Sequence, residues 1–153
     1  MPTLLVVHHT PSPHLGGLLD AVAEGAASDG LEDVEVVARP ALIAAEVEVL
    51  AADGIVLGTP ANLGWMSGAL KHFFDRIYYP CQAATPGRPY GLYVHGNDDT
   101  TGAVRSVQRV VTGLAWREVV APVSVVGAPD RAALDSCREL GATVAAYAAG
   151  LLD

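Results

Sequence analysis

Short apolar runs alternate with segments of helical periodicity along nearly the whole chain, and this alternation limits the fold more than any other feature. The apolar runs have the length and composition of strands buried on both faces of a parallel sheet, and they cover residues 4–8, 34–38, 54–58, 90–95 and 119–126. Helical spacing follows over residues 15–27, 43–50, 68–77, 104–114 and 131–152. Because each parallel crossover must return over a face of the sheet, we expect a three-layer α/β sandwich with a five-stranded parallel sheet.

Composition fits one folded unit. The chain has 153 residues, of which 51% are hydrophobic and 17% charged, so it can bury a core and is predicted to form a single domain over residues 1–153. The formal net charge of −8 argues against nucleic acid or an anionic membrane as a partner, since both attract clustered Lys and Arg.

The cysteines and the N-terminus bear on the compartment. Cys81 and Cys137 lie far apart and belong to no group with metal-ligand spacing, which predicts a reduced protein without a metal site. No apolar run reaches membrane-spanning length, and the first residues lack the basic region of a signal peptide. These features predict a cytoplasmic protein with no membrane span.

The most informative local stretch is AADGIVLGTPANLGWMSGALKHFFDR, residues 51–76. Its apolar run breaks into a turn over residues 59–64, which exposes backbone rather than large polar side chains. A helix is predicted from Ser67 onward, with inward residues Leu70, Phe73, Phe74 and Ile77. Such a turn lies at the carboxyl edge of a parallel sheet, where open α/β folds bind their ligands.

A strand followed by TPxxxGxMSGxLKxFFDR resembles the isoalloxazine-binding loop and next helix of the flavodoxin-like superfamily, particularly its NAD(P)H-dependent FMN reductase and quinone oxidoreductase branch. The resemblance implies the strand order 2-1-3-4-5 and an FMN cofactor. Other folds with the same alternation lack their signatures here. No G-x-G-x-x-G follows the first run, no Walker lysine is present, and His8-His9 and Gly58-Thr59 stand where a receiver domain needs acidic residues.

The resemblance implies that the loop after the first strand wraps the FMN phosphate. Thr10 and Ser12 match the hydroxyl positions of the family, whereas Pro13 and Leu15 replace a glycine and a hydroxyl residue. Pro13 has no N–H to donate, and His14 offers a ring N–H in compensation. The candidate phosphate ligands are Thr10, Ser12, His14 and Leu15. Ser12 and Pro13 fit a helix N-cap and first helical position equally, so both interpretations stay open.

Two further loops are implied to run along the flavin ring. The second loop contributes Pro60, Ala61, Asn62, Leu63, Gly64 and Trp65, where the glycine permits close approach and the tryptophan can stack on a ring. The third loop contributes His95, Gly96, Asn97 and Asp98, whereas Asp99 fits a helix cap. Tyr78, Tyr79 and Tyr90 are further candidates for lining a substrate cavity.

No nucleophile–base pair, metal cluster or carboxylate dyad stands out, so no catalytic side chain is predicted. This suits flavin chemistry, in which N5 of the cofactor carries the reaction. The leading hypothesis is an FMN oxidoreductase that passes electrons from NAD(P)H to a quinone or similar small acceptor, as a monomer or a homo-oligomer. A flavodoxin-type electron carrier and a flavin-free interaction module are the alternatives. The visible spectrum with FMN, followed by bleaching with NADPH or NADH, separates the three.

Replacing Thr10 and Ser12 together with Ala is expected to lower the affinity for FMN by roughly tenfold or more, and the affinity for riboflavin much less. A hydroxyl bonded to a charged phosphate contributes about 1.5–3 kcal/mol. Fluorescence titration with both flavins measures the two affinities. Equal losses for FMN and riboflavin would mean that the loop only caps a helix.

Overall fold

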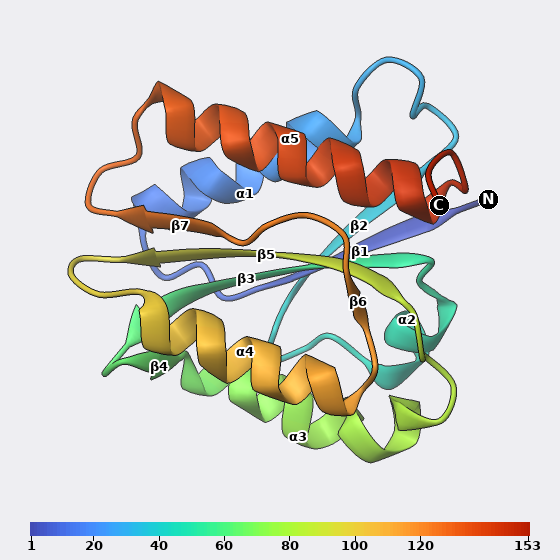
Figure 1. Ribbon diagram of the computed structural model, residues 1–153, viewed down its shortest axis with the longest axis horizontal. Helices are drawn as coiled ribbons and strands as arrows, with labels where there is room; N and C mark the ends of the chain where they lie inside the picture. Colours follow the sequence, from blue (N-terminus) through green and yellow to red (C-terminus); the bar gives the residue numbers. More distant parts are fainter.

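The computed structural model describes residues 1–153, and its strands form one sheet held between two layers of helices (Figure 1). The strands are β1 (Thr3–His8), β2 (Glu35–Pro40), β3 (Gly54–Asn62), β4 (Trp65–Met66), β5 (Pro89–Gly96), β6 (Arg117–Glu118) and β7 (Val123–Val126). The helices are α1 (Pro13–Ala26), α2 (Glu46–Ala51), α3 (Gly68–Gln82), α4 (Thr101–Gly113) and α5 (Arg131–Ala148).

The strand order is β2-β1-β3-β5, and both β6 and β7 pair with the remaining edge of β5. Since β6 and β7 occupy the fifth strand position, the predicted order 2-1-3-4-5 is confirmed. All of these pairs are parallel, and only the short β4 runs antiparallel, against the end of β3. The chain therefore has the three-layer flavodoxin-like architecture that the sequence predicted.

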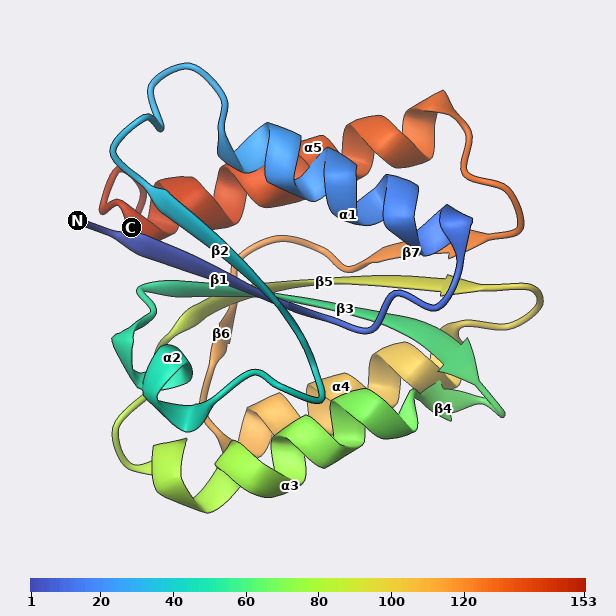
Figure 2. The ribbon, with the colours of Figure 1, turned by 180° about the vertical axis from the view of Figure 1, so that it is seen from behind.

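Alternating side chains of the central strands pack into two separate cores, one on each face of the sheet. In β3, Ile55 and Leu57 pack into a core of 22 buried residues on the α3–α4 side, and Val56 packs into a core of 16 on the α1–α5 side. Figure 2 shows the helix pairs α1–α5 and α3–α4 on opposite faces of the sheet. Because both faces are covered, the central strands β1, β3 and β5 are mostly apolar rather than alternating, as parallel sheets require. None of the helices is long and apolar enough to span a membrane.

The fifth strand is broken, which corrects the prediction of one continuous strand over residues 119–126. β6 ends at Glu118, and β7 begins only at Val123. Pro122 directly precedes β7 and has no N–H for the ladder, so it interrupts the pairing with β5.

Three helices differ from their predicted limits. α3 continues to Gln82, so Tyr78 and Tyr79 are helical rather than in a loop, because Cys81 extends the buried stripe of the helix. α2 begins at Glu46 and buries Val49, whereas Val47 is exposed. α5 ends at Ala148 rather than near residue 152. There Gly150, at φ +74°, donates to Tyr147 O, and Leu151 donates to Ala146 O, the pattern of a Schellman cap.

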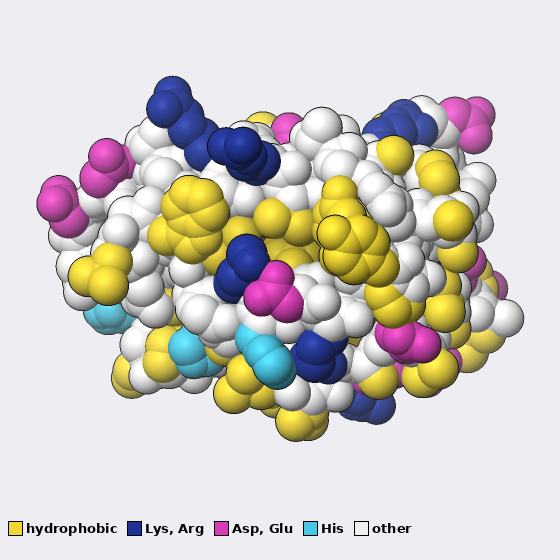
Figure 3. Space-filling model, turned by 90° about the horizontal axis from the view of Figure 1, so that it is seen from below, with side chains coloured by type: hydrophobic (Ala, Val, Ile, Leu, Met, Phe, Trp, Pro, Cys, Tyr) yellow, Lys and Arg dark blue, Asp and Glu magenta, His cyan; other side chains and the backbone are white.

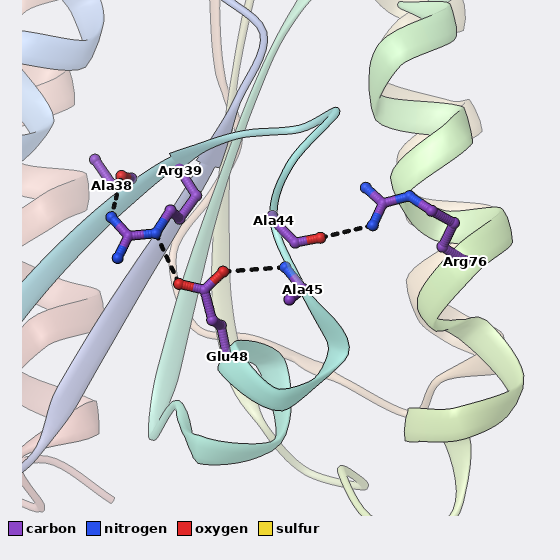
Figure 4. Close-up of polar contacts among 6 residues, drawn as sticks. All are labelled: Ala38, Arg39, Ala44, Ala45, Glu48 and Arg76. Atoms are coloured by element: carbon purple, nitrogen blue, oxygen red, sulfur yellow. Dashed lines mark hydrogen bonds and ion pairs between the residues drawn. The ribbon is translucent and has the colours of Figure 1, made fainter.

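Charge-assisted hydrogen bonds hold the segment between β2 and β3 in place (Figure 4). Arg76 of α3 donates to the carbonyl oxygens of Ala44 at 2.8 Å and Ala41 at 2.7 Å. Glu48 of α2 accepts from Arg39 Nε at 2.7 Å and from the Ala45 amide at 3.0 Å. These bonds fix the path of the segment, together with the burial of Ala41, Ala44 and Val49 in the core on the α3–α4 side.

The outer face of α3 and α4 carries exposed aromatic side chains. Figure 3 shows hydrophobic side chains around a shallow hollow on this face. The hollow has a volume of about 210 Å³ and is lined by Lys71, Phe74, Asp75, Tyr78, Tyr79 and Val110. Lys71 and Asp75 form an ion pair of 2.6 Å within it.

Two glycines allow α1 and α5 to pack with backbones almost in contact. A Cβ on Gly25 of α1 would collide with the carbonyl oxygen of Arg138, and a Cβ on Gly141 of α5 would collide with that of Val22. Both helices therefore need glycine at these positions. At Gly17 of α1, by contrast, a Cβ would meet nothing within 4 Å.

Gly141→Ala is expected to lower the free energy of unfolding by about 2 kcal/mol, because the added methyl group must push α5 away from α1. Gly17→Ala is the matched control and is expected to raise it by about 0.5–1 kcal/mol through helix propensity. Urea denaturation of both variants measures the two changes. Equal responses would contradict the close packing of α1 and α5.

Candidate functional site

Three loops lie together at the carboxyl edge of the sheet, after β1, β3 and β5 (Figure 1, left). They are neighbours because β3 pairs with both other strands. The rings of His14 in the first loop region and His95 at the third are 5.2 Å apart, centroid to centroid. Gly96 lies against Ala61, where an added Cβ would be 3.2 Å from the alanine Cβ. The structure thus brings the three predicted segments to one place.

The first loop ends in a capped helix. Ser12 is the N-cap of α1, and its Oγ accepts from the Leu15 amide at 3.3 Å. Pro13 occupies the first helical position. The cap and a phosphate contact are compatible, since a serine hydroxyl that accepts one bond still has its O–H to donate.

Leu15 contributes neither side chain nor amide to the surface of the site. Its side chain is buried in the core below α1, and its amide is held by Ser12. Thr10 shares a hydrogen bond of 2.7 Å between its Oγ1 and His8 Nδ1. The amides of Thr10, Ser12 and His14 form no hydrogen bond within the protein. Free amides beside a helix N-terminus are the donors that bind phosphate groups in proteins.

The second loop is a hairpin rather than the long turn that the sequence predicted. β3 continues through Pro60 to Asn62, and Trp65 lies in β4 instead of at the start of a helix. The turn itself is only Leu63 and Gly64, with φ of +52° and +75°. Positive φ at both central residues is typical of a type I′ turn, which matches the twist of the flanking strands. Pro60 is buried, and its position in β3 is paired with His95.

Leu63 is the unusual residue of this turn. A leucine rarely adopts a left-handed conformation, and here its side chain is fully exposed. Backbone strain of this kind persists where the surroundings hold the chain in place, often at ligand-binding sites.

Residues that the sequence analysis did not select position this hairpin. The Met66 amide donates to Ser106 Oγ of α4 at 3.1 Å, and the Ser67 amide donates to Thr59 Oγ1 at 3.0 Å. Gly102 of α4 lies so close to the Gly64 carbonyl that a Cβ there would collide with it. Ser106 and Gly102 lie about forty residues away along the chain and carry no local signal, so only the fold could identify them.

The third loop combines exposed backbone with a buried histidine. Asn97 and Asp98 are exposed. Asp99 precedes Thr100, the N-cap of α4, and accepts from the Thr101 amide at 2.9 Å; this bond lowers the pKa of its carboxyl group. His95 is only 5% exposed, and its Nε2 donates to Gly127 O at 2.9 Å.

A cleft of about 340 Å³ lies between the second and third loops. Its lining residues are Ala61, Leu63, Gly64, Gly96, Asn97, Asp98 and Asp99. Small-molecule sites commonly occupy about 300–1,000 Å³. The amides of Leu63, Gly64, Asn97 and Asp98 have no partner within the protein, so they can donate to the polar edge of a planar ring. A larger hollow of about 560 Å³ lies between β7 and α5, away from these loops.

Other candidates lie elsewhere. Tyr78 and Tyr79 lie about 15 Å or more from the start of α3, measured along the helix axis. Tyr90 lies at the opposite end of β5, where its hydroxyl is 3.2 Å from Glu118 Oε1. These tyrosines therefore do not line the cleft. The structure contains no group of three or more His, Cys, Asp or Glu residues that could hold a metal ion.

Comparison with known proteins gives the family. Residues 29–130 match the family described as NADPH-dependent FMN reductase. The chain belongs to this family. A flavodoxin from Aquifex aeolicus is 38% identical over 77 residues, which are 50% of this chain and 40% of that protein. The match thus spans less than half the length of this curated relative.

Solved structures confirm the fold of this FMN reductase family member. A flavodoxin, WrbA-like protein from Agrobacterium tumefaciens superposes with a TM-score of 0.77 at 22% identity, covering 98% of this chain and 99% of that one. A flavodoxin from the domain Archaea gives 0.78 at 18% identity, covering 96% and 99%. The Flv1 flavodiiron core from Synechocystis gives 0.81 at 15% identity, covering 99% of this chain but 37% of that one.

Family membership and the flavodoxin relative support an FMN-binding protein of the oxidoreductase or electron-carrier class. The local chemistry fits that cofactor. Hydroxyls and free amides beside the start of α1 suit a phosphate, and the cleft with its free amides suits the edge of an isoalloxazine ring.

Gly102→Ala is expected to weaken FMN binding by about tenfold, or about 1.4 kcal/mol, because the new methyl group displaces the Leu63–Gly64 turn. Gly68→Ala, at the start of α3 where a Cβ meets nothing within 4 Å, is the matched control and should bind FMN normally. Fluorescence titration gives both affinities, with melting temperatures as a check on folding. Unchanged FMN affinity in Gly102→Ala would mean that the Leu63–Gly64 turn does not contact the cofactor.

Proposed function

We propose that this protein is an NAD(P)H-dependent FMN oxidoreductase that reduces a quinone or a similar small acceptor. The observation that carries the proposal is the family match over residues 29–130. The cleft between the second and third loops supports it, because it lies at the carboxyl edge where ligands bind in open α/β sheets. Bound FMN would supply hydride and electron transfer at its N5 atom.

The residues of this chain would bind and orient the reactants. In the proposal, the Thr10 and Ser12 hydroxyls hold the phosphate together with the free amides of their loop. Pro60 to Trp65 and His95 to Asp98 enclose the ring. Within them, the Gly64 and Asn97 amides donate to its polar edge, and Gly96 allows the third loop to lie close to the second. No side chain is assigned to proton transfer.

Exposed apolar side chains beside the cleft favour a small acceptor. Leu63 is fully exposed at the tip of the hairpin, and Trp65 is 47% exposed in β4. A flat, apolar acceptor gains about 0.5–1.5 kcal/mol from stacking on an aromatic ring, beyond the area that it buries. Leu63 lines the cleft and Trp65 lies two residues further along the same hairpin, so we expect this surface to suit a quinone better than a charged metabolite.

An electron carrier is the second candidate, and the 38% identity to a flavodoxin favours it. Asp98 and Asp99 place carboxylates at the cleft, and carriers dock their partners through surface charge. A carrier needs a separate reductase and shows rates that fall strongly with salt.

The proposal also takes residues 1–153 as one FMN-binding domain that works in the cytoplasm. Its two cores lie on the faces of a single sheet, and Cys81 and Cys137 are buried and unpaired. It includes association into a homo-oligomer, which sedimentation velocity tests directly.

Trp65→Ala is expected to lower quinone turnover by about tenfold, because the stacking contact and its buried area are lost. Reduction by NAD(P)H should change less, since backbone groups are proposed to position the nicotinamide. Tyr79→Ala removes an aromatic side chain that is 82% exposed and outside the cleft, and it serves as the control. Equal effects of both substitutions on quinone turnover would mean that Trp65 does not contact the acceptor.

Stopped-flow mixing of the FMN-loaded protein with NADPH or NADH decides between enzyme and carrier. The enzyme should be reduced by at least one nucleotide and should turn over with a quinone. Absence of reduction by either nucleotide within minutes would overturn the enzyme and favour the carrier.

A further inference from the structure

The loop proposed to receive the FMN phosphate contains histidines but no permanent cation. All nine Lys and Arg residues lie outside the segments 8–14, 62–66 and 96–100. Four of the five histidines gather at this edge of the sheet: His8, His9, His14 and His95. Only an imidazole can therefore bring positive charge to the ligand from within these loops.

Neutral donors at the start of α1 are also fewer than a helix normally offers. A helix start leaves four amides without a partner in the helix. Here these four belong to residues 12–15, of which Pro13 has no N–H and Leu15 donates to Ser12 Oγ at 3.3 Å. Only the Ser12 and His14 amides remain free, so a phosphate would gain much from a charged side chain.

The rings of His14 and His95 are arranged to supply that charge. Their centroids are 5.2 Å apart with an interplanar angle of 56°. His95 is buried and anchored through Nε2 to Gly127 O; because a carbonyl can only accept, Nε2 carries the hydrogen. His14 is exposed, so its protonated form remains solvated. His95 therefore acts as a fixed wall against which the His14 ring rests.

The two histidines of β1 are less suited to carry charge. His8 is bonded to Thr10 Oγ1, and burial lowers the pKa of His8, with a smaller contribution from the charge of His9. His9 Nδ1 is buried without a partner. Both side chains are half-buried, whereas His14 is exposed.

We propose that the His14 imidazolium, positioned by the ring of His95, binds the phosphate of FMN, so that the affinity for FMN falls as the pH rises above neutrality. This inference rests on the FMN site of the proposed function. In this inference His14 contributes to FMN affinity through the phosphate, and the second and third loops bind the flavin ring.

The sign of the pH dependence follows from the charges. A phosphate monoester has its second pKa near 6, so above about pH 7 its charge no longer changes. Histidine ordinarily has a pKa of about 6.5, and a bound dianion raises it. Each unit of that rise strengthens binding about tenfold at low pH, and this gain is lost as the pH rises through the raised value.

Other charged groups at this edge do not titrate in the same range. Asp99 and Asp130 accept from the Thr101 and Ala133 amides at 2.9 and 2.8 Å, and Asp98 is exposed. Carboxylates ordinarily titrate near pH 4, and an arginine such as Arg131 at the start of α5 stays charged throughout. A change between pH 6.5 and 8.5 therefore reports the histidines.

Dissociation constants for FMN and riboflavin, measured by fluorescence quenching from pH 6.5 to 8.5, test the proposal. The unmodified protein should lose about tenfold in FMN affinity over this range and show constant riboflavin affinity. His14→Asn keeps a hydrogen-bond donor without a titrating charge and should give a flat FMN curve. His72→Asn, on the exposed face of α3, is the control and should keep the slope.

Calorimetry in buffers of different ionisation enthalpy gives a second measurement. FMN binding at pH 7.5 should take up protons in the unmodified protein but not in His14→Asn. FMN binding that is independent of pH, or a slope that survives in His14→Asn, would overturn this inference alone. Failure to bind either flavin at any pH would overturn the proposed function and this inference together.

Discussion

The pairing of β3 with β1 on one side and β5 on the other determines where every loop of the candidate site lies. Parallel strands end at the same edge of a sheet, so the segments after these three strands must be neighbours. The pairing is stable because the central strands are buried on both faces, with 22 buried residues in one core and 16 in the other. Backbone groups in such a setting must find partners in the ladder, which leaves no freedom of register.

The second loop shows how this frame positions a ligand-binding segment. The β3–β4 hairpin is strained at Leu63, and it has no apolar core beneath its tip. Contacts from α4 stabilise it instead, through Ser106 and the close approach of Gly102 to Gly64. Since α4 itself packs on β5, the hairpin and the third loop are held by one helix. The width of the cleft between them therefore depends on the position of α4 relative to the sheet.

Electrostatics separates this chain from a generic phosphate loop. A protein of net charge −8 must attract an anionic cofactor through local features, and in our proposal these are free amides, hydroxyls and imidazoles rather than Lys or Arg. Pro13 and Leu15 remove donors that a phosphate loop commonly offers. His14, which lies beside His95, can replace them with a ring N–H. We therefore expect cofactor affinity in this loop to depend on pH, whereas the affinity of a loop with hydroxyls alone would not.

Local patterns in the sequence were sufficient for the three layers and for the positions of the loops, because burial on both faces produces continuous apolar runs and helical periodicity reports the inward side. The strand order followed only from the resemblance of residues 51–76 to the flavodoxin-like superfamily. The same patterns could not reveal the break at Pro122, the helical state of Tyr78 and Tyr79, or the hairpin at Trp65. Each of these depends on which neighbour offers a hydrogen bond or a buried contact. Likewise, Ser106, Gly102 and the His14–His95 contact join residues distant in the chain. Sequence alone therefore determined the architecture and the family, while the tertiary structure decided the shape and charge of the site, because these arise from contacts between separate segments.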